Sequence, residues 1–333
     1  MTDDRQDSAT IRSWDNYWQH TQSRSAYSGG GATHPAVRGF WDEVFAAARA
    51  EFDNPRLADI ASGSGAVADA ARGSFGISGV RLTCVDVSEA AIAALQKRLP
   101  EVTVVVADAR DIPLAPASFE LVCSQFGIEY AGLDAVRELL RLVRPGGQAA
   151  LLLHHRGGGI FRQCNASLDA VRQLQDADFI GKTAAMFVAG FRMLREGSRE
   201  EYESAAGDLM PAIRSMESIM RQHGRQVADG AVLKLYTDVR TMAARLPNYD
   251  EREVAEWLAR MRGEFSAYEG RMASMCEAAV DESAFASLCA DVEAAGFELQ
   301  RREALLNTET DIPLAWALIA AAHSASSAAT ASG

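Results

Sequence analysis

The stretch that decides the fold is LADIASGSGAV, residues 57–67. It begins with a short apolar run that contains the acidic residue Asp59, and this run predicts a buried strand. Gly63 and Gly65 follow. Glycine adopts backbone conformations that other residues resist, and it has no side chain where a ligand must come close. The residues from 66 onward predict a helix, whose first amides attract negative charge. Strand, glycine turn and helix together predict a nucleotide-type site at the edge of an α/β sheet.

The glycine turn alone does not identify the nucleotide. The spacing Gly63-x-Gly65-x-x-Ala68 also fits the dinucleotide fingerprint of NAD-dependent enzymes. The sequence around the turn therefore has to decide between the two classes of ligand.

On both sides of this turn, apolar segments alternate with helical ones. Such alternation is typical of βαβ units, so residues 36–156 are expected to form a doubly wound, mostly parallel sheet. Ser88 is placed to cap the helix that follows the second strand, together with Ala91. The expected strands are 56–61, 80–85, 102–106, 118–124 and 147–153, and the expected helices are 36–52, 66–72, 88–99 and 133–143, with an Arg-Pro-Gly-Gly turn before the last strand.

The strand signal disappears between residues 157 and 281, where a large helical insertion is predicted. Apolar residues recur there at alternating four- and three-residue steps, in one series from Tyr202 to Met220 and in another from Val254 to Ala279. Pro211 lies inside the first series and is expected to kink or break that helix. The two stripes either pack against each other within the chain or form the seam of a homodimer.

Residues 282–322 return to the α/β pattern and complete the core. A helix over 282–295 precedes two strands, 297–305 and 313–321, which are too close in sequence for a helical crossover and are expected to pair antiparallel. The fold class is therefore α/β, a doubly wound Rossmann-like sheet with an antiparallel last strand. Residues 1–35, with their aromatic cluster, are expected to form an N-terminal flap, and residues 323–333 a disordered tail.

Composition and charge exclude several classes of function. The 333 residues carry a formal net charge of −12, which disfavours nucleic acid as a partner because phosphate requires a basic surface. The five cysteines are scattered and form no C-x-x-C pair, so neither a metal site nor a disulfide framework is expected. The N-terminus lacks the apolar core of a signal peptide, and no stretch is long enough to span a membrane. A cytoplasmic protein is therefore expected.

The motifs around and after the glycine turn resemble those of the class I S-adenosylmethionine-dependent methyltransferases. Residues 57–65 resemble the first motif, with Ala61 where the family has its first glycine. The next three motifs are matched by LTCVDVSEAAI, ADARDIPLAPASFELV and FELVCSQFGIEY, and a further family feature by LLRLVRPGGQAALLL. The resemblance is strong over residues 56–155 and weaker over 282–322. It implies a methyltransferase fold with S-adenosylmethionine (SAM) as the cofactor.

The resemblance also implies which residues bind the cofactor. They are Asp59, Ala61, Gly63 and Gly65 for the methionine moiety, Asp86 for the ribose hydroxyls, Asp108 and the Ala109 amide for the adenine, and Val87, Gln125 and Tyr27 elsewhere around the cofactor. Each of the three aspartates has a structural alternative, because such a side chain can cap the turn that follows it. Asp86 would equally suit the ribose of a nicotinamide cofactor.

Methyl transfer is an in-line displacement, for which alignment and exclusion of water matter most. A base helps where the acceptor is a protonated amine or a hydroxyl. Three residues are candidates for this catalytic role: Glu129 after the fourth strand, and His154 and His155 at the end of the fifth. Strand alternation turns only one of the two histidines toward the site. The alternative is structural, with a histidine that satisfies backbone groups and Glu129 paired with an arginine of the insertion.

The expected activity is O- or N-methylation of a small-molecule acceptor. The insertion is expected to act as a helical lid beside the acceptor pocket, with the glycines at 157–159 as a hinge. Its methionine-rich stripes favour a partly hydrophobic acceptor, although core packing accounts for the same residues. Two other functions fit parts of the pattern: an NAD(P)-dependent oxidoreductase with the same glycine turn, and a non-catalytic SAM-binding regulatory protein.

Overall fold

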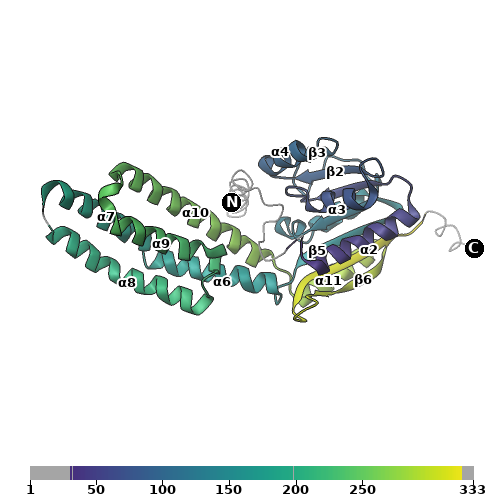
Figure 1. Ribbon diagram of the computed structural model, residues 1–333. Coiled ribbons are helices and arrows are strands. Elements are labelled where there is room, and N and C mark those ends of the chain that lie inside the picture. The colour runs from purple at the N-terminus through teal and green to yellow at the C-terminus, as the bar shows by residue number, and fades with distance from the viewer. Residues whose placement is uncertain (1–30, 32, 198, 325–333) are drawn as a thin grey trace, which may run out of the picture. The chain divides into compact units, whose positions relative to one another are not determined.

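The computed structural model of the chain describes residues 31, 33–197 and 199–324. These residues form two compact units. The α/β unit comprises the chain up to Arg162 and from Ser274 onward, and the helical unit comprises Gln163–Ala273. Figure 1 shows the α/β unit mainly in purple, blue and yellow, and the helical unit in teal and green.

The α/β unit is built on a seven-stranded sheet with the order β3-β2-β1-β4-β5-β7-β6. The first five strands are parallel, whereas β7 runs antiparallel to both β5 and β6. The predicted doubly wound sheet with an antiparallel closing hairpin is therefore confirmed. The strands are β1 Arg56–Ile60, β2 Arg81–Asp86, β3 Thr103–Val106, β4 Phe119–Gln125, β5 Val143–His154, β6 Phe297–Leu306 and β7 Pro313–Ala322.

Helices cover both faces of this sheet, which is why its central strands are apolar on both sides. One buried cluster joins side chains of α2, α3 and α4 to one face, and another joins α5 and α11 to the opposite face. Ser88 caps α4 as expected, since its Oγ accepts from the Ala91 amide at 3.1 Å. These helices are α2 Pro35–Glu51, α3 Ala66–Phe75, α4 Glu89–Arg98, α5 Ala135–Leu142 and α11 Glu282–Ala294.

The strand order reverses between β1 and β4. From β1 the chain proceeds outward through β2 and β3, and then returns to the other side of β1 with β4 and β5. Ligands of open α/β sheets bind at such a switch point, outside the carboxyl ends of the strands. The glycine turn follows β1 directly, so the fold places it at this position.

The segment expected as an Arg-Pro-Gly-Gly turn belongs to β5. Val143 pairs with Phe119 and Gln148 with Leu121, and the register shifts between these two pairs. The extra residues on β5 are accommodated as an irregularity of the ladder, so that strand pairing begins directly after α5.

The helical unit consists of packed helices around its own apolar core. The helices are α6 Gly159–Asp176, α7 Phe179–Glu196, α8 Glu200–His223, α9 Ala231–Ala244 and α10 Glu251–Ala278, with short 3-10 turns before α9 and α10. Both α6 and α10 continue from one unit into the other, because the division lies at residues 162/163 and 273/274. The units are therefore divided within two helices and not at the ends of the expected insertion, 157–281.

The two predicted apolar stripes lie on α8 and α10. Met216 of α8 and Leu258 and Phe265 of α10 belong to one buried cluster, and Phe265 is only 5% exposed. Packing within the chain, one of the two explanations offered by the sequence, therefore accounts for this part of the stripe. A homodimer through the helical region stays a prediction.

Pro211 does not break its helix, one of the two expected outcomes; a kink at this residue stays a prediction. α8 runs from Glu200 to His223 with Pro211 inside it. A proline removes the hydrogen bond to the carbonyl four residues earlier, here that of Gly207. Gly207 and Pro211 are both exposed, so water can take the place of the missing amide donor.

The glycines expected as a hinge form a closely packed turn. The Gly157 amide donates to His155 Nδ1 at 2.9 Å, and the Gly158 amide donates to the His155 carbonyl oxygen at 2.9 Å. A Cβ atom on Gly158 would lie 2.6 Å from the Pro313 carbonyl oxygen. Close approach of two backbones, rather than flexibility, therefore explains the glycine at 158.

Two features concern only the described part of the chain. No helix there is long and apolar enough to cross a membrane, and no group of three or more His, Cys, Asp or Glu side chains there is arranged to hold a metal ion. Most of the expected N-terminal flap, including Tyr27, lies outside the described residues, as do residues 325–333 of the expected tail.

Candidate active site

The turn after β1 has a left-handed backbone at three positions. Ala61 has φ 55°, Gly63 φ 51° and Gly65 φ 88°. A left-handed conformation costs a residue with a side chain about 1–2 kcal/mol, so Ala61 is strained at the position where the motif that it resembles has glycine. Gly65 is the N-cap of α3, and a Cβ atom on it would lie 2.8 Å from Leu95 of α4. The turn is therefore packed tightly against the neighbouring helix.

Arg98, at the end of α4, forms hydrogen bonds that stabilise this turn. Its guanidinium donates to the Ser64 carbonyl oxygen and to the Asp69 carboxylate of α3. One side chain thus joins the glycine turn, α3 and α4. Arg98 was not predicted from the sequence, because a basic residue in the last turn of a helix is common and gives no sign of a distant partner.

Asp59 is the most unusual charged group at this edge of the sheet. It is 1% exposed, and neither carboxylate oxygen has a hydrogen-bond partner among the described residues. In the strand register it lies beside Cys84 and Cys123. Burial, and then the charge of Asp86, raise the pKa of Asp59 well above its usual range, and the nearby Ala68 amide offsets part of this rise. A buried acid without a partner is well suited to receive a cationic ligand group.

Asp86 joins the end of β2 to the glycine turn. Its Oδ2 accepts from the Gly63 amide at 2.7 Å, and its Oδ1 accepts from the Ser88 amide at 2.9 Å. The capping role that the sequence left open for Asp86 is therefore present. A carboxylate accepts hydrogen bonds from hydroxyl groups as well as from amides, so capping and ligand binding do not exclude each other. Val87, the next residue, exposes 40% of its surface beside this carboxylate.

Asp108 lies after β3 and is paired within its own turn. Its carboxylate accepts from the Arg110 amide at 2.8 Å and from Arg110 Nη2 at 2.6 Å. These hydrogen bonds lower the pKa of Asp108. The structural alternative is thus present for Asp108 as well, and the predicted contact with adenine would have to be made beside Arg110. Ala109 is 8% exposed.

The end of β4 packs against the glycine turn. Gln125 Oε1 accepts from Trp41 Nε1 of α2 at 2.5 Å, a partner that the sequence did not predict. Phe126 has a left-handed backbone with φ 53°. Gly127 follows, and a Cβ atom there would lie 2.6 Å from the Ala61 carbonyl oxygen. Strained residues therefore meet where β1 and β4 end, as is common at functional sites.

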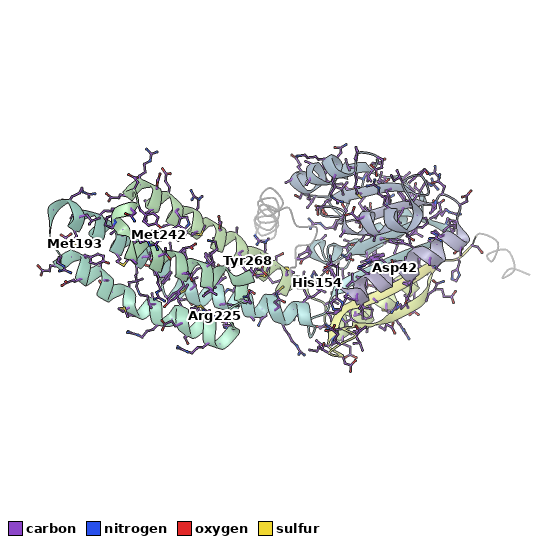
Figure 2. The ribbon with its side chains drawn as sticks, in the orientation of Figure 1. Asp42, His154, Met193, Arg225, Met242 and Tyr268 are labelled. Atoms are coloured by element: carbon purple, nitrogen blue, oxygen red, sulfur yellow. The ribbon has the colours of Figure 1, made fainter. Side chains whose placement is uncertain are left out.

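Glu129 and His154 form a buried pair. Glu129 Oε1 lies 2.7 Å from His154 Nδ1 and accepts from the His154 backbone amide at 2.9 Å. The side chains are 0% and 5% exposed, respectively. The Phe126 and Tyr130 rings contact the imidazole, with ring centroids 4.6 and 5.8 Å away. Figure 2 labels His154 in the α/β unit. The structure therefore brings together two of the three residues that the sequence proposed for catalysis.

His155 has a different environment. Its ring stacks on Trp316 of β7, with centroids 4.2 Å apart, and its Nδ1 accepts from the Gly157 amide. Burial lowers the pKa of His155, so the neutral ring is favoured. As strand alternation requires, the two histidines have separate contacts, and His155 supports the turn that leads into α6.

Part of the α/β unit is similar in sequence to known proteins. Residues 58–151 match the family described as a methyltransferase domain. Over 92 residues the chain is 38% identical to the malonyl-[acyl-carrier protein] O-methyltransferase of Enterobacter lignolyticus, a match covering 25% of this chain and 37% of that protein. Over 96 residues it is 33% identical to the demethylmenaquinone methyltransferase of Beutenbergia cavernae, covering 28% of this chain and 38% of that one.

The chain thus spans less than two-fifths of the length of each of these relatives. Among solved structures, a SAM-dependent methyltransferase from Aquifex aeolicus is 18% identical, with 37% of this chain and 69% of that chain covered and a TM-score of 0.32.

Proposed function

Because the α/β unit contains a class I SAM-dependent methyltransferase domain, we propose that the whole protein transfers the methyl group of SAM to an oxygen or nitrogen atom of a small molecule. The observation that carries this proposal is the arrangement at the ends of β1 and β2. There a buried carboxylate without a hydrogen-bond partner in the described part of the chain, a glycine turn and a second carboxylate adjoin one another at the switch point of the sheet.

The residues at this edge fit SAM. The unpaired Asp59 carboxylate suits the positively charged amino group of the methionine moiety. The Asp86 carboxylate is proposed to accept from the ribose hydroxyls, and the exposed Val87 offers an apolar surface for the adenine. When bound, SAM supplies a methyl group on a positively charged sulfur atom. The two carboxylates would hold this cofactor, and the glycine turn would align it.

We place the acceptor at the ends of β4 and β5. The side chains there are the aromatic Phe126 and Tyr130 together with the Glu129–His154 pair. Gly127 packs against Ala61, so this group adjoins the cofactor turn. Aromatic walls exclude water, and exclusion of water strengthens the electrostatic interactions on which a displacement of this kind depends.

The helical unit is proposed to help select the acceptor. In the sequence it follows β5, the strand that carries His154, at the place where a helical lid was predicted. Insertions after catalytic strands commonly supply specificity, because loops and lids vary while the sheet is kept.

Substitution of Asp86 tests the cofactor assignment. Asp86→Ala removes the hydrogen bonds to the ribose, each worth about 1.5–3 kcal/mol for a charged acceptor. Calorimetric titration should therefore show the affinity for SAM reduced by about tenfold or more. The matched control is Asp53→Ala, which removes an exposed carboxylate from the turn before β1 and should leave the affinity unchanged.

Asp86 also holds the Gly63 amide, so the circular dichroism and melting of the variant are measured alongside. Unchanged SAM affinity in a folded Asp86→Ala protein contradicts the proposed site. Tighter binding of NAD than of SAM by the wild-type protein would favour the oxidoreductase, and SAM binding without turnover on any acceptor would favour the regulatory protein.

A further inference from the structure

We propose that the helical unit has a binding site of its own for a small organic ammonium ion with apolar substituents. The site is a cavity of about 300 Å³ between α9 and the start of α10. All residues that line this cavity belong to the helical unit, in which Figure 2 labels one of them, Met242. The inference goes beyond the proposed methyl transfer and does not depend on it.

The cavity lies at the corner where the chain passes from α9 to α10. Asp238 and Met242 are four residues apart on α9, and Glu253 and Trp257 are four residues apart on α10. Residues at this spacing are neighbours on one face of a helix. Tyr249, between the two helices, also lines the cavity. These faces enclose a space at the small end of the range for small-molecule sites, so the ligand is a small compound.

The wall of the cavity is mainly aromatic and apolar. Tyr249 and Trp257 are half-buried, whereas Met242 and Val254 are buried. The faces of aromatic rings attract cations, and tryptophan does so most strongly. The thioether of methionine is polarizable and adapts to the shape of a ligand. A cation with apolar substituents gains from both kinds of contact.

The charges of the cavity are negative. Two carboxylates line it, those of Asp238 and Glu253, and no lysine, arginine or histidine does. Asp238 accepts from Lys234 Nζ at 2.6 Å, in a pair whose lysine side chain is 75% exposed. Exposed ion pairs of this kind are weak, so a bound cation can take the place of Lys234.

The start of α10 offers nothing to an anion. Asp250 Oδ1 accepts from the backbone amides of Arg252 and Glu253 at 2.9 and 3.2 Å. Glu251 adds a second carboxylate to this first turn. The positive end of the helix dipole is therefore already compensated. The Arg252 guanidinium pairs with Glu256 at 2.8 Å, on α10 and outside the cavity.

A metal ion fits this cavity poorly. Calcium and magnesium take six or more oxygen ligands, but the cavity provides two carboxylates and the Thr241 hydroxyl. That hydroxyl donates to the Thr237 carbonyl oxygen at 2.9 Å. Rings and a thioether make up most of the remaining wall. An ammonium ion with apolar substituents matches both the charge and the wall.

The ligand class is tested by calorimetric titration of the wild-type protein with choline and with its neutral carbon isostere, 3,3-dimethylbutan-1-ol. The two compounds have nearly the same shape, and only choline is charged. At constant ionic strength we expect saturable choline binding, at least about tenfold tighter than binding of the isostere. Equal affinity for the two compounds, or no saturable choline binding, overturns the inference.

The position of the site is tested with two variants. Trp257→Leu keeps an apolar side chain and removes the ring, and it should weaken choline binding by about fivefold or more. Glu253→Gln keeps the shape of an exposed side chain and removes its charge, and it should weaken binding by about threefold. The matched control is Glu264→Gln, which changes an exposed carboxylate of α10 outside the cavity and should bind choline like the wild type.

Circular dichroism and melting show whether each variant is folded. If Trp257→Leu does not fold, Glu253→Gln decides. Wild-type choline affinity in the folded variants overturns the inference, and so does loss of choline binding when S-adenosylhomocysteine is added, because choline would then occupy the cofactor site. Failure of the wild-type protein to bind SAM would refute the proposed function and leave the choline comparison intact.

Discussion

Asp59 shows how one residue can serve binding at the expense of stability. Its carboxylate is buried without a hydrogen-bond partner among the described residues. Burial of an ionised group without a partner is unfavourable, and the pKa of Asp59 is raised accordingly. The cationic group of SAM would supply the missing partner. The sequence can predict that an aspartate lies at the end of a strand. It cannot show that no donor among the described residues forms a hydrogen bond with the carboxylate oxygens.

We expect Asp59→Asn to stabilise the protein near neutral pH. The folded pKa of Asp59 lies above its unfolded value of about 3.9, so the wild-type carboxyl favours folding in its protonated form and loses that contribution as the pH rises from about 4 through the folded pKa. Asparagine does not titrate. Thermal melts between pH 4 and 8 should therefore show the advantage of the variant growing with pH, by up to about 1.4 kcal/mol per unit.

The same variant should bind SAM at least about tenfold more weakly, because a charged hydrogen bond is worth about 1.5–3 kcal/mol. The stability comparison is made as a difference from the wild type, so that other titrating groups cancel. A difference that stays constant or shrinks with rising pH would contradict the raised pKa. Unchanged SAM affinity would remove Asp59 from the site.

At the scale of elements, Arg98 couples α4 to the glycine turn. It bonds the Ser64 carbonyl oxygen and the Asp69 carboxylate of α3. Arg98→Met keeps the length of the side chain and removes these bonds. We expect the protein to lose about 1–3 kcal/mol of stability and several-fold in SAM affinity, because the turn is less firmly held.

Arg81→Met serves as the control, since Arg81 is an exposed arginine at the other end of β2. Chemical denaturation and calorimetry measure both quantities. Equal behaviour of the two variants would show that Arg98 does not support the turn.

The sequence predicted most elements because their signals are local. Apolar runs marked the strands, and Ser88 marked the start of α4. The sequence did not predict contacts between residues that lie far apart along the chain. Strand alternation predicted that His154 and His155 point apart, but only the folded sheet shows that Glu129 lies beside His154. Of the two outcomes expected at Pro211, a kink or a break of the helix, the break does not occur, since Gly207 and Pro211 are both exposed to water.

For the molecule as a whole, the two units have separate cores. Leu258 and Phe265 belong to the core of the helical unit, whereas the cofactor turn belongs to the α/β unit. Phe265→Glu places a charge where the side chain is 5% exposed. We expect it to destabilise the helical unit by several kcal/mol, about the cost of burying a charge without a partner, with the SAM affinity retained.

Ala259→Glu, on an exposed position of α10, is the control and should melt like the wild type. Light scattering on the same samples also tests the predicted homodimer. A mass near 35.8 kDa shows a monomer and refutes the dimer. If Phe265→Glu melts like the wild type, the stripe is not part of a core.

Binding of SAM at the turn after β1 is measured by equilibrium binding of radiolabelled SAM to the wild-type protein. We expect saturable binding at one site per chain, competed by S-adenosylhomocysteine, unaffected by excess NAD and at least about tenfold weaker in Asp59→Asn. Displacement of SAM by NAD at comparable concentration, or no saturable SAM binding by the folded protein, would contradict this expectation.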